Sequence, residues 1–114
     1  MLEKDHHPLL LEVKSVTLAE DGVAYFPDAV TARGTRHVQK LADIQEAGTH
    51  EAAVLFVVQR GDVKNVRPAT HIDPKFSAAL QQAATRGVQM LAMTTDVDLH
   101  GVTLGSRRIP VFFN

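Results

Sequence analysis

Two residues near the start of the chain, Glu12 and Lys14, have the types and the spacing for metal-assisted chemistry. Side chains alternate along a strand, so this acid and this lysine would share one face while Leu11 and Val13 point to the other. A carboxylate and an ammonium group side by side at a strand end can hold a divalent cation and position an attacking water. Mg²⁺ prefers carboxylates, keeps several waters and neutralises charge that develops on a phosphate. The pair therefore indicates a Mg²⁺ site or, alternatively, an ion pair exposed on a sheet.

The spacing of acid and lysine does not by itself decide between these alternatives. It recurs at Asp62-Val63-Lys64 and at Asp73-Pro74-Lys75 in the same chain. Only the pair at 12–14 lies late in an apolar run, where a strand is expected.

A second candidate cluster is basic and lies at the start of a predicted helix. Arg33 and His37 are four residues apart, so they share one side of that helix, and Arg36 and Lys40 lie in the same acid-free stretch. A helix N-terminus offers free N–H groups and a positive dipole end, which suit a phosphate. The cluster predicts phosphate contacts. The alternatives are a histidine bonded to a carbonyl at the edge of the core and arginines on a solvated helix face.

Three further polar residues follow predicted strands. Gln59 ends the central apolar run and Arg60 begins the next loop, and sites in open α/β sheets form at the carboxyl ends of strands. Asp28, after a Phe-Pro pair, is either a second carboxylate or an Asx turn. The alternative for Gln59 and Arg60 is that they satisfy backbone groups of the loop. The remaining histidines are scattered, and the sequence contains no recognisable zinc ligand set, Gly-rich phosphate loop or nucleophile elbow.

The hydrophobic pattern predicts one α/β domain that positions these residues. Asp73 and Pro74 form a good N-cap and N1 pair for a second helix, and glycines at 48 and 87 would end the two helices. Because helices link successive strands, we predict a largely parallel sheet covered on both sides. The predicted elements are strands at 9–16, 52–59 and 88–94, helices at 31–47 and 73–87, loops at 17–30 (with a short strand at 23–26) and 60–72, and a terminal hairpin at 101–114 that turns near 105–107.

Length and composition limit the class of protein. The 114 residues suffice for one compact domain, and 45% apolar and 22% charged residues are ordinary for a soluble globular protein. The longest apolar runs are far short of the roughly 20 residues of a membrane span, and no secretory signal is visible. The absence of cysteine excludes disulfides and thiolate sites. We expect a cytoplasmic protein without membrane contact, and its net charge of −1 argues mildly against a dedicated nucleic-acid binder.

Several segments together resemble the sugar fermentation stimulation family, in the same order and spacing, from about residue 9 nearly to the end. The most specific is the FPDA-x-T-x-RG-x-x-H pattern within residues 25–41. The resemblance implies a C-terminal restriction-endonuclease-like domain at 9–114, with a central mixed sheet flanked by helices. In the family this domain follows an N-terminal OB-like domain, a common platform for single-stranded nucleic acids. The matching segments are EVKSVTL at 12–18, YFPDAVTARGTRHVQKL at 25–41, VLFVVQR at 54–60, HIDPKF at 71–76 and GVQMLA at 87–92.

The resemblance also implies roles for the candidate residues. Glu12 and Lys14 match the second half of the PD-(D/E)xK nuclease signature. By that analogy Glu12 binds Mg²⁺ with help from the Val13 carbonyl, and Lys14 positions or deprotonates water. Arg33 and His37 then contact phosphate or a leaving group. The remaining nucleic-acid contacts are predicted at Arg36, Gln59 and Arg60.

The sequence departs from the nuclease pattern at its start. The pattern requires an aspartate on the strand before Glu12, and Asp5, in a short charged stretch interrupted by Pro8, is a poor candidate. We therefore expect residues 1–8 to be an irregular segment at a truncation boundary. The metal site would then be incomplete and this segment by itself inactive.

Three functions follow from these observations. The first is a DNA-binding protein implicated in the regulation of sugar, notably maltose, catabolism, with a nuclease-like domain that need not cut. The second is a Mg²⁺-dependent nuclease that acts on DNA phosphodiesters. The third is an interaction module with a vestigial site.

Overall fold

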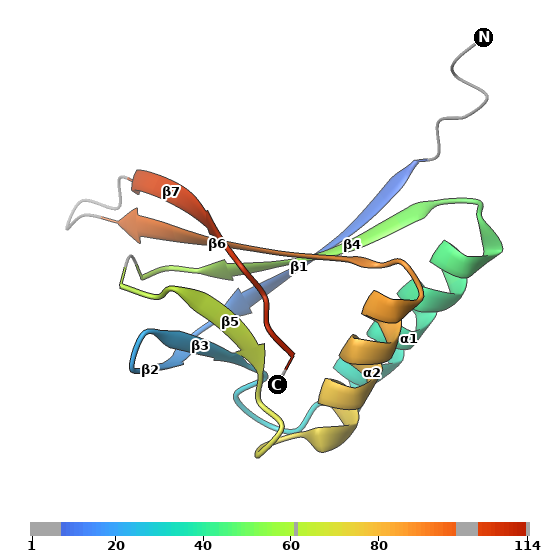
Figure 1. The fold of residues 1–114 in the computed structure, drawn as a ribbon, viewed down its shortest axis with the longest axis horizontal. Helices are drawn as coiled ribbons and strands as arrows, with labels where there is room; N and C mark the ends of the chain where they lie inside the picture. Colours follow the sequence, from blue (N-terminus) through green and yellow to red (C-terminus); the bar gives the residue numbers. More distant parts are fainter. Residues whose placement is uncertain (1–7, 61, 98–102, 114) are drawn as a thin grey trace, which may run out of the picture.

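The computed structural model describes residues 8–60, 62–97 and 103–113, which form two β-sheets and a layer of helices (Figure 1). The elements in chain order are β1 (Leu9–Val16), β2 (Leu18–Glu20), β3 (Val23–Phe26), α1 (Ala32–Ala47), β4 (Glu51–Val58), β5 (Asn65–Pro68), α2 (Pro74–Thr85), β6 (Gln89–Val97) and β7 (Thr103–Ile109).

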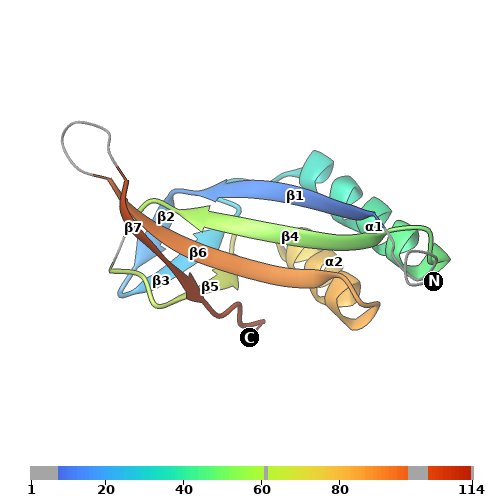
Figure 2. The ribbon, with the colours of Figure 1, turned by 90° about the horizontal axis from the view of Figure 1, so that it is seen from above.

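The larger sheet has the strand order β1-β4-β6-β7, in which β7 alone is antiparallel to its neighbour. The prediction that this sheet is covered on both sides is wrong, because both helices pack on the same face (Figures 1 and 2). The physical reason is the handedness of crossovers between parallel strands, which is nearly always right-handed. The chain moves from β1 to β4 to β6 without reversing direction, so each crossover places its helix on the same side.

The smaller sheet has the order β2-β3-β5, and β2 and β5 lie in segments predicted to be loops. β2 pairs with β3 through a tight turn at Asp21 and Gly22, both with positive φ, which is the backbone of a two-residue hairpin. β5 pairs with β3 in parallel and lies within the predicted polar connection at 60–72. Its four residues are too few and too polar to show a strand pattern, and it forms because β3 offers a free edge.

The predicted terminal hairpin with a turn near residues 105–107 is also wrong. Residues Thr103–Ile109 form one strand along β6, where Gly105 pairs with Asp96 and Arg107 with Thr94. The Gly105-Ser106 pair is a turn signal in the sequence, but pairing with the edge of β6 keeps these residues extended. The start of the predicted hairpin, at residues 101 and 102, lies outside the described residues, as do residues 1–7 of the predicted irregular segment.

The chain ends on the smaller sheet. After β7, the Val66 N–H donates to the Pro110 carbonyl (3.0 Å) and the Phe112 N–H donates to the Val66 carbonyl (2.9 Å). Val111 thereby adds a parallel bridge at the edge of β5. The last residues connect the two sheets.

The main core lies between the larger sheet and the helices. Phe56 on β4 and Phe76 and Leu80 on α2 are among its largest fully buried side chains. The predicted helix ends are confirmed by Gly48, which caps α1 with φ of 80°, and by Asp73 with Pro74, which begin α2. In the described part of the chain, no helix is both long and apolar enough to cross a membrane.

Candidate functional site

β1 places Glu12 and Lys14 on the side of the helix layer, as their alternation predicted. These two side chains are partly buried, whereas Leu11 and Val13 between and beside them are exposed. The Lys14 ammonium lies 3.0 Å from the Glu12 carboxylate, and the Lys14 side chain is only 13% exposed. An ion pair taken out of water gains little net stability, because desolvation offsets the attraction. The structure therefore shows an ion pair that is partly shielded from water, with the Glu12 side chain 34% exposed.

His37 from α1 completes this cluster. Its Nδ1 lies 3.8 Å from the same Glu12 oxygen that contacts Lys14. The two elements border an open cavity of about 250 Å³. Lys40, one turn after His37, lines it as well, and its spacing of three residues from His37 is the signal that could have placed it there. The cavity is lined by Leu10, Glu12, His37, Lys40, Leu41 and Ile44.

Hydrogen bonds at the start of α1 fix how this helix presents His37. The Gly34 N–H donates to the Thr31 side chain (2.9 Å), which caps the helix. The Thr31 N–H in turn donates to Asp73 (2.8 Å), whose other oxygen accepts from the Phe76 N–H (3.0 Å). The beginnings of α1 and α2 are thereby tied to one buried carboxylate. The Thr31 N–H, and then the Phe76 N–H, lower the pKa of Asp73.

The two predicted arginine contacts on α1 lie on different sides of the helix. Arg33 is exposed one turn before His37, towards the carboxyl end of β1, because α1 runs against the strand direction (Figure 1). Arg36 is also exposed but borders a separate cavity with Asp73 and Lys75. By helical spacing Arg33, and not Arg36, shares the side of α1 that carries His37, although Arg33 is not among the residues that line the Glu12 cavity.

Gln59 and Arg60 lie at the carboxyl ends of β1 and β4, where the strand order predicted a site. Both border a cavity of about 280 Å³ that the end of β1 also lines. Arg60 is held by Asp62 at 2.7 Å, and this hydrogen-bonded pair raises the pKa of Arg60 and lowers that of Asp62. Asp28 reaches the same end of β1, where its carboxylate accepts from the Thr17 hydroxyl at 3.4 Å.

The donor atoms around Glu12 fit an open metal site and not a closed one. Within residues 8–60, 62–97 and 103–113, no group of three or more metal-ligating side chains comes together. Glu12 offers a carboxylate that is 34% exposed, and the His37 imidazole lies beside it. Mg²⁺ commonly takes one or two carboxylates and completes its shell with water and phosphate oxygens. These residues can therefore supply part of such a shell.

Comparison with known proteins decides the family. The family model described as the sugar fermentation stimulation protein RE domain matches residues 1–101 of this chain. The chain belongs to the sugar fermentation stimulation family. A family relative from Syntrophotalea carbinolica is 45% identical over 115 residues, covering 100% of this chain and 49% of the relative. One from Thioalkalivibrio sulfidiphilus is 48% identical over 105 residues, covering 91% of this chain and 44% of the relative.

A solved family structure confirms the predicted fold class. The structure of Pyrococcus furiosus SfsA in complex with Ca²⁺ matches with a TM-score of 0.83 at 28% identity, over 91% of this chain and 45% of that chain. This family domain accordingly has the predicted nuclease-like α/β fold, with a central mixed sheet and helices. The chain spans about half the length of the relatives it matches.

Proposed function

We propose that this chain binds DNA through phosphate contacts at the start of α1 and the carboxyl end of β1. The observation that supports it is the position of Arg33 and Lys40 on either side of His37, along a helix face that borders the Glu12 cavity. In the described part of the chain neither basic residue forms an ion pair, so both charges are available to a phosphate. Family membership makes regulation of sugar, notably maltose, catabolism the setting of this activity. A cytoplasmic location and an OB-like domain as partner belong to the same proposal.

A divalent cation at Glu12 is part of this proposal. Mg²⁺ would neutralise charge on a bound phosphate and lower the pKa of a bound water. Glu12 supplies the carboxylate, Lys14 restrains that carboxylate at 3.0 Å, and the His37 imidazole lies beside it with Nδ1 at 3.8 Å. The Pyrococcus relative's complex with Ca²⁺ supports a divalent cation in this family, since both ions take oxygen ligands.

Hydrolysis of DNA phosphodiesters is the second candidate function. One arrangement favours this function: the largely buried Lys14 ammonium and the His37 imidazole both lie beside the same Glu12 carboxylate oxygen. In that case Lys14 positions the attacking water and His37 or Arg33 faces the leaving group.

DNA binding is tested by titrating a fluorescently labelled duplex with the chain at increasing salt. Contacts of Arg33 and Lys40 with two phosphates predict a slope of about −2 for log K against log salt concentration, and Arg33→Ala should reduce its magnitude by about one. Arg86→Ala is the matched control, because Arg86 is already held by Asp43 and Glu46 at the other end of the helices. Binding that does not respond to salt, or an equal loss in both variants, contradicts the proposal.

The metal and cleavage steps are tested with neighbouring residues of β1. Calorimetric titration with Mn²⁺ should show binding that Glu12→Gln abolishes and Val13→Thr preserves, because Val13 points to the opposite face. Plasmid DNA is then incubated with Mg²⁺ or Mn²⁺ and either this chain or the full-length Syntrophotalea relative. This experiment separates DNA binding from DNA cleavage. Metal-dependent cutting lost in Glu12→Gln and Lys14→Ala identifies a nuclease. Shifted but uncut DNA leaves a DNA-binding domain.

A further inference from the structure

A second polar and aromatic surface lies on the smaller sheet, away from the Glu12 cluster. Ala24 on β3 and Val66 on β5 face the core, so Tyr25 and Arg67 face outward by alternation. The two outward residues are direct partners in the β3–β5 register. The sheet thus sets an aromatic ring beside a guanidinium group.

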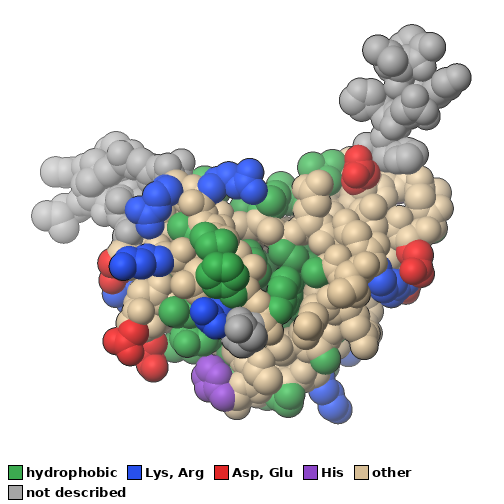
Figure 3. All heavy atoms as spheres, in the orientation of Figure 1, with side chains coloured by type: hydrophobic (Ala, Val, Ile, Leu, Met, Phe, Trp, Pro, Cys, Tyr) green, Lys and Arg blue, Asp and Glu red, His purple; other side chains and the backbone are tan. Residues whose placement is uncertain are grey.

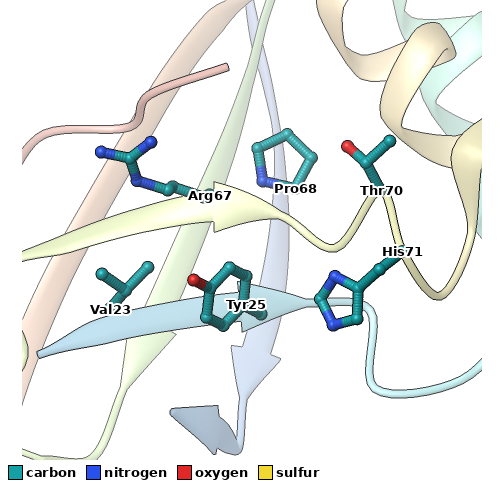
Figure 4. Close-up of a pocket in the computed structure, with 6 residues that line it drawn as sticks. All are labelled: Val23, Tyr25, Arg67, Pro68, Thr70 and His71. Atoms are coloured by element: carbon teal, nitrogen blue, oxygen red, sulfur yellow. The ribbon is translucent and has the colours of Figure 1, made fainter. Parts of the chain in front are cut away.

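A broad hollow of about 570 Å³ opens over these residues (Figure 4). His71, just after β5, meets Tyr25 edge to face, with ring centroids 5.5 Å apart and an angle of 89° between the planes. The guanidinium of Arg67 lies 5.4 Å from the centre of the Phe112 ring. The hollow is lined by Val23, Tyr25, Arg67, Pro68, Thr70 and His71.

The surroundings of this hollow are partly basic. Arg107 donates to the Val63 carbonyl at 2.9 Å, which places it against the segment that leads into β5, and Lys64 lies exposed in the same segment. Acids lie at one end of the same sheet: Glu20 pairs with Val23, and Asp21 lies in the turn between β2 and β3. Figure 3 shows Lys and Arg side chains towards β7 and, below them on the side of the smaller sheet, acidic side chains as well.

We propose that this surface, defined by Tyr25, Arg67 and His71, binds an unpaired stretch of DNA. Exposed aromatic rings on a sheet, interleaved with cations, are suited to stack bases and hold phosphates without reading sequence. The half-buried Tyr25 and the exposed His71 offer ring surfaces to a base. Arg67, whose Nε–H donates to the Asn65 side-chain oxygen at 3.1 Å, is held in place and adds positive charge beside the rings. A paired base keeps its faces stacked in the duplex, so the surface selects single strands. The inference extends the proposed DNA binding with a second contact surface of different chemistry.

The sequence makes this surface easy to observe, because Tyr25 is the only tyrosine and the chain has no tryptophan. Irradiation of the chain with a short oligothymidine carrying one 5-iodouracil should cross-link the base to Tyr25, as mapped by mass spectrometry. Titration of a labelled oligothymidine, followed by anisotropy, should show Tyr25→Leu binding roughly 5- to 150-fold more weakly, the range expected for losing one stacked base. Tyr25→Phe keeps the ring and should bind like the natural chain.

The same titrations separate this inference from the proposed function. If Tyr25→Leu binds single strands more weakly, its circular dichroism is unchanged and Arg33→Ala has no effect, the stacking surface is supported. The proposed phosphate contacts of α1 are then rejected. Unchanged binding in Tyr25→Leu beside weaker binding in Arg33→Ala overturns the stacking surface and keeps the proposed function. The stacking surface is also overturned by any of three results: a mononucleotide binds as tightly as the oligomer, the cross-link is confined to other residues, or single strands do not bind.

Discussion

The two faces of the larger sheet differ in a way that the composition of its strands does not suggest. On the helix side, Val54, Phe56 and Val58 of β4 are 0–1% exposed. On the opposite side, Leu11 and Val13 of β1 are 46% and 55% exposed, and no described helix covers them. The edge strand therefore exposes Leu11 and Val13 on its open face, while Glu12 and Lys14 share the helix side with the buried Val16.

The helix side of β1 thus combines a charged pair with the buried Val16 of the core. Burying Lys14 to 13% exposure beside Glu12 costs desolvation energy that an apolar pair would not. Positions at which a chain keeps such a cost are candidates for function, because structure alone does not require it. Two substitutions on the faces of the sheet, and two at the starts of the helices that cover one face, measure this difference.

The largest effect is expected for Phe56→Ala on the covered face. The side chain is fully buried between the sheet and the helices, and truncation leaves a cavity. Urea denaturation should show a loss of about 3–5 kcal/mol in unfolding free energy. A loss below about 1 kcal/mol would contradict the assignment of this face as the core.

A loss of about 2 kcal/mol is expected for Asp73→Ala, which removes the acceptor shared by the Thr31 and Phe76 N–H groups. The contribution should depend on pH with a defined sign. Because the folded-state pKa of Asp73 lies below its unfolded value, its stabilisation is present above about pH 4 and is lost as the pH falls through the folded-state pKa. Chemical denaturation of both proteins between neutral and acid pH measures this, and a difference that grows on acidification would contradict it.

A smaller loss, about 1–2 kcal/mol, is expected for Gly34→Ala. A methyl group there would lie 2.9 Å from the Thr31 side chain and 3.4 Å from the Phe76 ring. The crowding outweighs the gain of about 1 kcal/mol in helix propensity. Thermal melts measure the change, and a stabilised variant would show that the helix start relaxes freely.

The smallest effect is expected for Leu11→Thr on the open face. An exposed strand position tolerates a β-branched polar residue, so unfolding free energy should change by less than about 0.5 kcal/mol. A loss above about 1 kcal/mol would mean that this face is covered in solution. Sedimentation of the natural chain over a range of concentrations would then show whether a second copy covers it.

Local signals predicted the elements that position the site. Asp73 with Pro74 begins α2 as expected, and the alternation at residues 11–14 gave the correct faces of β1. The turn at Asp21 and Gly22 carried a hairpin signal that the interpretation missed, since an Asp-Gly pair between two short strands is typical of this turn.

Other features depend on partners far along the chain and could not be predicted. β5 is a strand only because β3, about forty residues earlier, offers its edge, and the single covered face follows from strand order. His37 was chosen for its helix position, but its approach to Glu12 across the fold required the structure. Arg36 is different, because the helical period that set it opposite Val38 already placed it away from the sheet.

The hydrogen bonds of Val66 with Pro110 and Phe112 also protect the molecule from pairing with other chains. A strand edge with unpaired N–H and C=O groups is a template on which another strand can add. The smaller sheet has the order β2-β3-β5, so β5 lies at its edge, and these two bonds occupy groups of that edge. A substitution that detached residues 110–112 from β5 would therefore favour aggregation, although the Glu12 cluster itself would be unchanged.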